Sequence, residues 1–224
     1  KLNSFFWLFS IDLKSSKKVI RSVITNWINF NKNYSFKSWE IDTLSKRILS
    51  WIANSNSFYH EADEQFKISF TNIIKKQLNH LINEIEGTEI VNDKMIGCSA
   101  IILGGLCFKH QFQYINFGLQ ILKRIIDTNF DNDGFPKSRN PRHIILYLRY
   151  FIFVREILKD TNSEIPEYLN EIIFYLGHSF DFYFNENESR YLFNGNHNLN
   201  ITEFKKYLKE HGYKFKNKLN SVGG

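Results

Sequence analysis

The sequence is poor in the residues that mark several large classes of protein. Its 224 residues include only 3 prolines and 11 glycines, which excludes a collagen-like or low-complexity chain and argues against a turn-rich β-sandwich. Its apolar runs fall well short of the roughly 18 residues that a membrane-spanning helix needs, so we expect no membrane span. Apolar residues make up 43% and charged residues 23% of the chain, as in an average folded globular domain.

Patterns for metal, cofactor or nucleic-acid binding are also missing. The two cysteines, Cys98 and Cys107, lie nine residues apart in the most apolar stretch, about 13 Å along a helix, which is too far for a disulfide. We therefore expect two buried thiols. Neither has a partner at CxxC spacing, and the seven histidines show no paired spacing, so we expect no metal site and no cofactor. No recognisable nucleic-acid-binding string occurs, and we expect no such partner.

The net charge of +6 and the pI near 9.1 favour anionic partners. Such partners include nucleic acid, a membrane surface or an acidic polysaccharide. Heavy use of Lys, Asn and Ile with little Ala is typical of an AT-rich genome and explains the same charge. The charge alone does not identify a partner.

The apolar residues recur with the period of an α-helix along almost the whole chain. Short polar loops separate the helical segments, and a short strand is predicted at Arg190–Phe193. Such helix pairs predict an all-α array, which is a toroid, a solenoid or a bundle. The predicted helices cover residues 17–30, 38–52, 66–85, 92–108, 112–126, 141–159, 166–184 and 201–211.

The loop before residue 141 combines several groups that attract anions. Asn140 and Pro141 are typical of the N-cap and first residue of a helix, and the free amides of a helix N-terminus favour negative charge. These features predict a carboxylate or sulfate site, with an exposed basic loop as the alternative. The basic side chains of the loop and helix start are Lys137, Arg139, Arg142 and His143.

Five strings, in order along nearly the whole chain, resemble a known family. They are Ser4-Phe5-Phe6-Trp7-Leu8; Trp39 with Leu49-Ser50-Trp51-Ile52-Ala53; Asn92 followed by Ala100-Ile101-Ile102-Leu103-Gly104-Gly105-Leu106-Cys107-Phe108; Asp133-Gly134 with Ser138-Arg139-Asn140-Pro141; and Leu192-Phe193-Asn194-Gly195. With these strings the chain resembles the heparinase II/III-like polysaccharide lyases, especially their shorter bacterial members. The resemblance implies an incomplete (α/α) toroid over residues 1–195. Residues 196–224 are then a linker and the start of a truncated β-sandwich domain, the rest of which lies beyond this chain.

The resemblance also implies a reaction and roles for particular residues. Such lyases cleave uronic-acid polysaccharides by β-elimination, in which neutralising the C5 carboxylate acidifies the C5 proton that a base removes. Asn92 matches the neutralising Asn, although a helix N-cap is its alternative role. His143 stands where characterised members have the Tyr base, and Tyr147, one turn further on, is a second candidate base. We predict substrate contacts from Lys137, Arg139, Arg142, Asn194 and His197.

The function predicted from the sequence is therefore the toroid half of a lyase. Its partners are an anionic polysaccharide, heparin- or heparan-like or related, and the β-sandwich domain of the same protein, without which we expect the chain to be inactive. Because the Tyr is missing, the alternative function is a toroid that binds anionic glycan without cleaving it. A helical interaction scaffold unrelated to sugar is a third possibility, which the order of the strings argues against. The sequence does not choose between periplasm and cytoplasm.

Overall fold

The computed structural model describes residues 2–12, 16–108, 112–184 and 200–215. In these residues the regular structure is helical, with a single isolated β-bridge between Phe130 and Pro136 and no strand. The prediction of an all-α chain is confirmed. The predicted strand at Arg190–Phe193 lies outside the described residues. No helix in the described part of the chain is both long and apolar enough to cross a bilayer.

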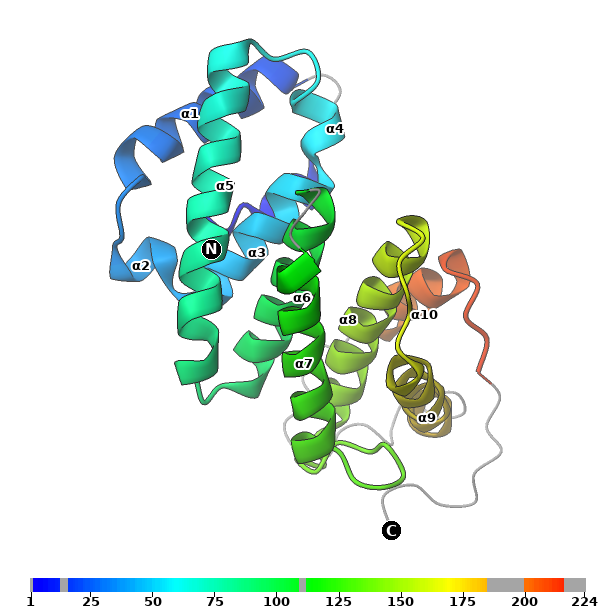
Figure 1. The fold of residues 1–224 in the computed structure, drawn as a ribbon. Helices are drawn as coiled ribbons and strands as arrows, with labels where there is room; N and C mark the ends of the chain where they lie inside the picture. Colours follow the sequence, from blue (N-terminus) through cyan, green and yellow to red (C-terminus); the bar gives the residue numbers. More distant parts are fainter. Residues whose placement is uncertain (1, 13–15, 109–111, 185–199, 216–224) are drawn as a thin grey trace. The chain divides into compact units, whose positions relative to one another are not determined.

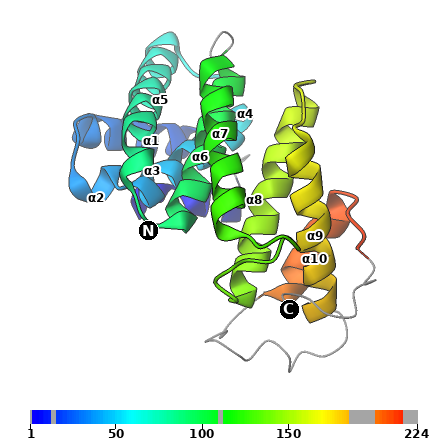
Figure 2. The same ribbon diagram turned by 60° about the horizontal axis from the view of Figure 1, so that its bottom comes forward.

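The chain divides into two compact units, Lys1–Ile121 and Leu122–Gly224. Figures 1 and 2 show the helices of each. The first unit holds η1 (Leu2–Ser4), η2 (Phe6–Ser10), α1 (Lys17–Asn31), α2 (Phe36–Trp39), α3 (Ile41–Ala53), α4 (Ser55–Phe58), α5 (Glu64–Glu84), η3 (Ile85–Gly87), α6 (Val91–Cys107) and the start of α7 (Phe112–Asn129). The second holds the end of α7, α8 (Pro141–Asp160), α9 (Glu167–Phe184) and α10 (Ile201–Glu210).

The helix bounds follow the predicted ones closely where a local signal sets them. Asp63 caps α5, because its Oδ1 accepts a hydrogen bond from the Phe66 N–H at 2.8 Å. Asn140 likewise accepts from the Arg142 N–H at 3.0 Å and caps α8, with Pro141 as its first residue. The predicted helix 38–52 is instead two helices, because Glu40 has an extended ψ of 138° between α2 and α3.

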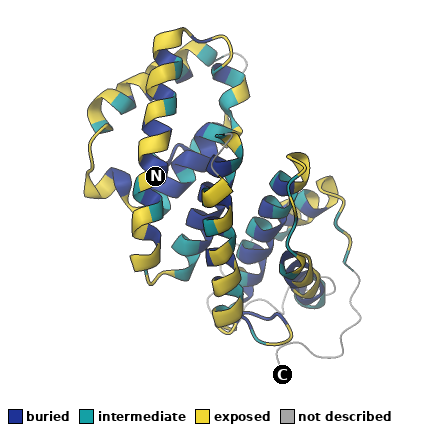
Figure 3. Ribbon diagram, in the orientation of Figure 1, coloured by how far each residue is buried: buried dark blue, intermediate teal, exposed yellow. Residues whose placement is uncertain are grey.

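Helix α3 is the centre of the first unit. It packs against α6, α5 and η1, and Figure 3 shows it buried along most of its length. Helix α6 is buried on several sides, as its all-round apolar character predicts. Its glycines let neighbouring helices approach closely, since a Cβ on Gly104 would lie 2.6 Å from the Leu78 methyls of α5.

An arginine of α3 is fully buried between these helices. Arg47 of α3 is 0% exposed. Its Nη1 donates 2.8 Å hydrogen bonds to the carbonyl oxygens of Asn3 in η1 and Ser38 in α2, and its Nε donates a 3.1 Å bond to Gln77 Oε1 in α5. One side chain therefore links α3 to three other elements.

Aromatic rings enclose the same guanidinium. Its carbon lies 4.1 Å from the Trp27 ring centroid and 6.0 Å from that of Trp51, which is cation–π geometry. Phe5, buried and at a left-handed φ of 54°, packs edge-on against both tryptophans. Burial lowers the pKa of Arg47 to about 9, which still leaves it charged at neutral pH.

The second unit is built on the pair α8 and α9, which lie side by side in both ribbon views. Helix α10 adds to this pair through the Phe204 ring, 5.1 Å from that of Phe180 in α9. The Tyr213 hydroxyl donates to Glu156 at 2.7 Å and accepts from Arg155 at 3.1 Å. This contact fastens the segment after α10 to α8.

The prediction of a buried thiol is confirmed for Cys98 and wrong for Cys107. Cys98 is buried and donates to the Met95 carbonyl at 3.1 Å, whereas Cys107 is exposed. Cys107 is the last residue of α6, where the helix emerges from the packed core, so its apolar neighbours in sequence do not cover it.

The close approach of α6 and α7 at Gly118 gives a stability prediction. A Cβ there would lie 2.6 Å from Ile102 Cγ1 and 3.1 Å from the Cys98 carbonyl oxygen. We expect Gly118→Val to lower the free energy of unfolding by about 2 kcal/mol, because the backbone carbonyl cannot move away. Urea unfolding measures this change. Gly87→Ala is the control, since nothing lies within 4 Å of its added Cβ; equal losses in both variants would contradict the packing described.

Replacing Arg47 tests its linking role. Arg47→Met keeps the apolar bulk but leaves the Asn3 and Ser38 carbonyls without their donor, so we expect a loss of about 3 kcal/mol in the free energy of unfolding. The neighbouring Lys46 pairs with Asp42 at the surface, and Lys46→Met should cost less than about 1 kcal/mol. Thermal and urea unfolding compare the two. A loss for Arg47→Met no larger than that for Lys46→Met would show that the buried contacts carry little stability.

Candidate functional site

The loop between α7 and α8 is held by its own hydrogen bonds. Asp131 Oδ1 accepts from the Phe135 N–H at 2.8 Å and from the Asp133 N–H at 3.1 Å. Gly134 has a φ of +69°, and a Cβ on it would lie 2.5 Å from Tyr175 of α9. The turn therefore requires glycine both for its backbone angle and for its close contact, which fixes the start of α8.

Two of the predicted substrate-binding cations already have partners, one in this loop and one in the last turn of α7. Arg139 Nη1 lies 3.2 Å from Asp131 Oδ2, and its guanidinium lies 5.4 Å from the Phe135 ring centroid. Lys137 Nζ donates to the Thr128 carbonyl at 2.9 Å. Arg142 lies exposed in the first turn of α8. An anion at this loop could therefore contact Arg142 directly. To contact Arg139 or Lys137, it would have to compete with Asp131 or with the Thr128 carbonyl.

His143 is held in place by the loop that precedes it. Its Nδ1 lies 2.7 Å from Ser138 Oγ, and its ring lies 5.3 Å from the Tyr147 ring. Burial, and then the charge of Arg142, lower the pKa of His143 below its usual value, so the imidazole is neutral at neutral pH. When Nδ1 donates its hydrogen to Ser138 Oγ, Nε2 carries the lone pair that a general base needs.

Tyr147 is much less suited to take a proton. It is 3% exposed and packs against the rings of Phe130 and Phe151. Burial raises its pKa to about 12, which keeps the phenol protonated. The geometry therefore favours His143 over Tyr147 as the candidate base.

Asn92 lies in the first turn of α6, in the first unit. It is not the N-cap, a position that Ile90 occupies, so that alternative is wrong. Its Oδ1 is buried and has no hydrogen-bond partner among the described residues. Arg139 and His143 belong to the second unit, and the roles of all three residues in one reaction stay a prediction. Asn194 and His197 lie outside the described residues.

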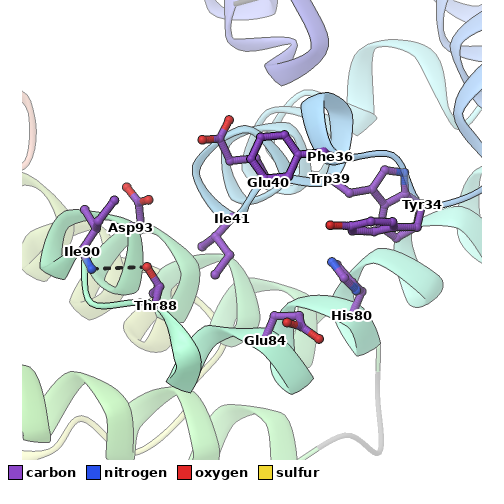
Figure 4. Close-up of a pocket in the computed structure, with 10 residues that line it drawn as sticks. All are labelled: Tyr34, Phe36, Trp39, Glu40, Ile41, His80, Glu84, Thr88, Ile90 and Asp93. Atoms are coloured by element: carbon purple, nitrogen blue, oxygen red, sulfur yellow. Dashed lines mark hydrogen bonds between the residues drawn. The ribbon is translucent and has the colours of Figure 1, made fainter.

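The first unit also contains a pocket of about 320 Å³ (Figure 4). Asp93, the residue after Asn92 in α6, lines this pocket. Trp39 and Tyr34 face His80 at one end, each with its ring centroid 5.3 Å from the imidazole. Thr88, Ile90 and Asp93 lie at the other end. The lining residues are Tyr34, Phe36, Trp39, Glu40, Ile41, His80, Glu84, Thr88, Ile90 and Asp93.

The pocket carries negative charge. Glu40, Glu84 and Asp93 contribute carboxylates, and none of the described lining residues is a lysine or arginine. Desolvation, and then the charges of Asp42 and Glu40, raise the pKa of Asp93, with Lys46 acting in the opposite direction. The sequence did not reveal this pocket because its residues come from several helices and from the loops between them.

Comparisons of the chain with protein-family models, with curated proteins and with solved structures find no match.

The environment of His143 predicts a measurable titration. We expect NMR to place its pKa below the ordinary histidine value, and Arg142→Gln to raise that pKa part of the way back, since the positive charge disfavours the imidazolium while burial remains. Lys137→Gln removes the same charge from the loop, but Lys137 is not among the causes of the shift, so this control should change the pKa less. A pKa at or above 6.5 in the unaltered chain would contradict the buried position.

Proposed function

We propose that this chain is the helical toroid part of a polysaccharide lyase that cleaves uronic-acid-containing anionic polysaccharides by β-elimination. The ordered strings support this proposal, as does the all-helical structure with its hairpin-paired α8 and α9. The observation that carries it is the pair of Ser138 and His143 at the N-terminus of α8. This pair places a neutral, oriented imidazole next to a helix end that favours anions.

In the proposed reaction His143 takes the C5 proton of the uronate. The C5–H electron pair forms the C4–C5 double bond while the bond from C4 to O4 breaks, and an acid protonates the departing O4. Charge grows on the uronate carboxylate as the proton leaves, so hydrogen-bond donors to that group contribute most to the rate. Asn92 supplies such a donor through its amide, and Arg142 adds positive charge near the base.

The domain organisation that we propose rests on the same resemblance. Residues 1–195 form an incomplete (α/α) toroid, and residues 196–224 form a linker to a β-sandwich domain that completes the catalytic cleft, with α10 of that linker packed on α9. The proposed substrates are heparin- or heparan-like glycosaminoglycans or related acidic polysaccharides. In this scheme the β-sandwich domain supplies the acid that protonates O4.

A glycan-binding toroid without catalysis is the second candidate. It is favoured by the His at the position of the expected Tyr, by the burial of Tyr147 and by the internal partners of Arg139 and Lys137. Exposed aromatic rings suit either function, because sugar rings pack on flat apolar faces. Tyr34 and Phe36, which line the pocket of the first unit, are 63% and 75% exposed.

Incubation of the full-length protein with a panel of acidic polysaccharides tests the proposal. We expect ultraviolet absorbance from unsaturated uronate products. His143→Ala should lower turnover on the order of a hundredfold by removing the base, and Asn92→Ala by a similar factor or more by removing the carboxylate partner. Tyr147→Phe is the matched control, since it removes only a buried hydroxyl, and it should change turnover less than about tenfold.

Two outcomes would argue against catalysis by these residues. Unchanged turnover in both His143→Ala and Asn92→Ala would contradict the assigned roles. Binding of acidic oligosaccharide without any unsaturated product would favour the non-catalytic toroid.

A further inference from the structure

The positive charge of the chain is concentrated in one part of the sequence. Residues 1–39, which end with α2, hold seven lysines and arginines and one acidic residue, whereas the other 185 residues hold 22 of each kind. The whole net charge of +6 therefore belongs to this segment. An AT-rich genome would raise the lysine content along the entire chain, so composition alone does not explain the concentration.

The same segment carries most of the exposed apolar side chains. Of the fourteen large apolar side chains that are exposed in the described residues, nine lie within residues 2–36. Proteins rarely leave a large group of apolar side chains in water unless the group contacts a partner. We call six of the nine the N-terminal apolar surface, which consists of Leu2, Phe6, Phe9, Val19, Val23 and Phe30.

Helix α1 has a second apolar stripe besides the one that it buries. The buried stripe consists of Ile20, Ile24 and Trp27. Val19, Val23 and Phe30 follow one another at intervals of four and seven residues, which places them on one line along the helix. Phe30 is 87% exposed, and Figure 3 shows much of α1 in contact with solvent. Packing within the first unit explains only the buried stripe.

The 3₁₀ segments η1 and η2 lie next to this second stripe. Trp27, which is one turn from Val23, donates its Nε1 hydrogen to Asn3 Oδ1 in η1 at 3.1 Å. In η2 the exposed rings of Phe6 and Phe9 pack against each other, with centroids 5.2 Å apart. The apolar side chains of α1 and those of the 3₁₀ segments therefore border one another.

Basic side chains accompany the apolar ones. Lys18 in α1, Lys32 just after it and Lys37 in α2 are exposed, and neither helix contains an acidic residue. Lys17 contributes less, because its Nζ pairs with Glu61 at 2.9 Å. A lysine can lay its methylene groups on an apolar surface while its ammonium group stays in water. Exposed apolar side chains among lysines are typical of a segment that lies in the interface of an anionic bilayer.

We propose that the N-terminal apolar surface binds the surface of a membrane that contains anionic lipids. The apolar side chains enter the boundary between the headgroups and the acyl chains, and the lysines contact the phosphate and carboxylate groups of the lipids. All of these residues lie in the first unit. The inference therefore depends neither on the proposed lyase activity nor on the second unit.

Two other occupants fit this surface less well. A second copy of the chain would bring together two segments that each carry a net charge of +6, and these segments repel each other. Nucleic acid would use the lysines, but Leu2, Val19 and Val23 have no flat ring on which a base stacks. Of the three occupants, a lipid surface is the one that uses the apolar and the basic side chains together.

Co-sedimentation of the full-length protein with lipid vesicles tests the inference. We expect about tenfold tighter binding to vesicles of phosphatidylcholine mixed with phosphatidylserine than to phosphatidylcholine alone, because several lysines lie near the charged surface. Added salt should weaken this binding by screening the charges. Phe30→Ser and Val19→Ser should each weaken it about fivefold, since each removes an apolar group that the bilayer covers.

Matched controls separate this surface from similar residues elsewhere. Phe112 of α7 is 73% exposed and lies outside the surface, so Phe112→Ser should change binding by less than about twofold. Lys37→Gln should weaken binding about threefold, whereas Lys206→Gln removes the same charge from α10 and should have a smaller effect. Phe30 and Val19 are largely exposed, so unchanged urea midpoints in their variants are expected and exclude unfolding as the cause.

Several results would overturn the inference. These include no binding to anionic vesicles, equal binding to both kinds of vesicle, and equal losses in Phe30→Ser and Phe112→Ser. Tighter binding to random-sequence duplex DNA than to anionic vesicles would assign the basic residues to nucleic acid instead. A dimer in analytical ultracentrifugation that Phe30→Ser dissociates would assign the surface to a second copy of the chain.

Discussion

The first unit depends on one buried positive charge. Arg47 is held by two backbone carbonyls, one amide oxygen and the faces of two tryptophans. Taking a guanidinium out of water is costly, and the cost is recovered only if its hydrogen bonds are well placed. The N-terminal segment, α2 and α5 must therefore stay in register with α3, which aligns the elements that form the acidic pocket.

The arrangement around Arg47 also explains where the pocket lies. Ser38, which accepts from Arg47, immediately precedes Trp39, and Gln77 lies on α5 less than one turn before His80. The hydrogen bonds that hold the arginine thus fix the two helices, α2 and α5, that supply Trp39 and His80 at the aromatic end of the pocket. At the other end, the packing of α6 on α3 positions Asp93. Stability and the candidate site are consequently coupled within this unit.

The two units differ in the chemistry of their candidate sites. The second unit offers an oriented imidazole at a helix N-terminus beside the exposed Arg142, whereas the first offers carboxylates and aromatic rings.

The sequence by itself determined the helical class and most helix bounds. The apolar period is a local signal that repeats over many turns, and caps such as Asp63 and Asn140 act within three residues. The place of His143 in the first turn of a helix could also be predicted from the sequence, whereas its hydrogen bond with Ser138 came from the structure. What the tertiary structure decided depends on contacts between distant segments. The choice of which helices meet decided four features: the break at Glu40, the exposure of Cys107, the burial of Tyr147 and the acidic pocket. Each polar residue of that pocket, taken alone, has the sequence pattern of an ordinary surface residue. Local periodicity records which face of a helix is apolar, but only packing selects the neighbour that covers it.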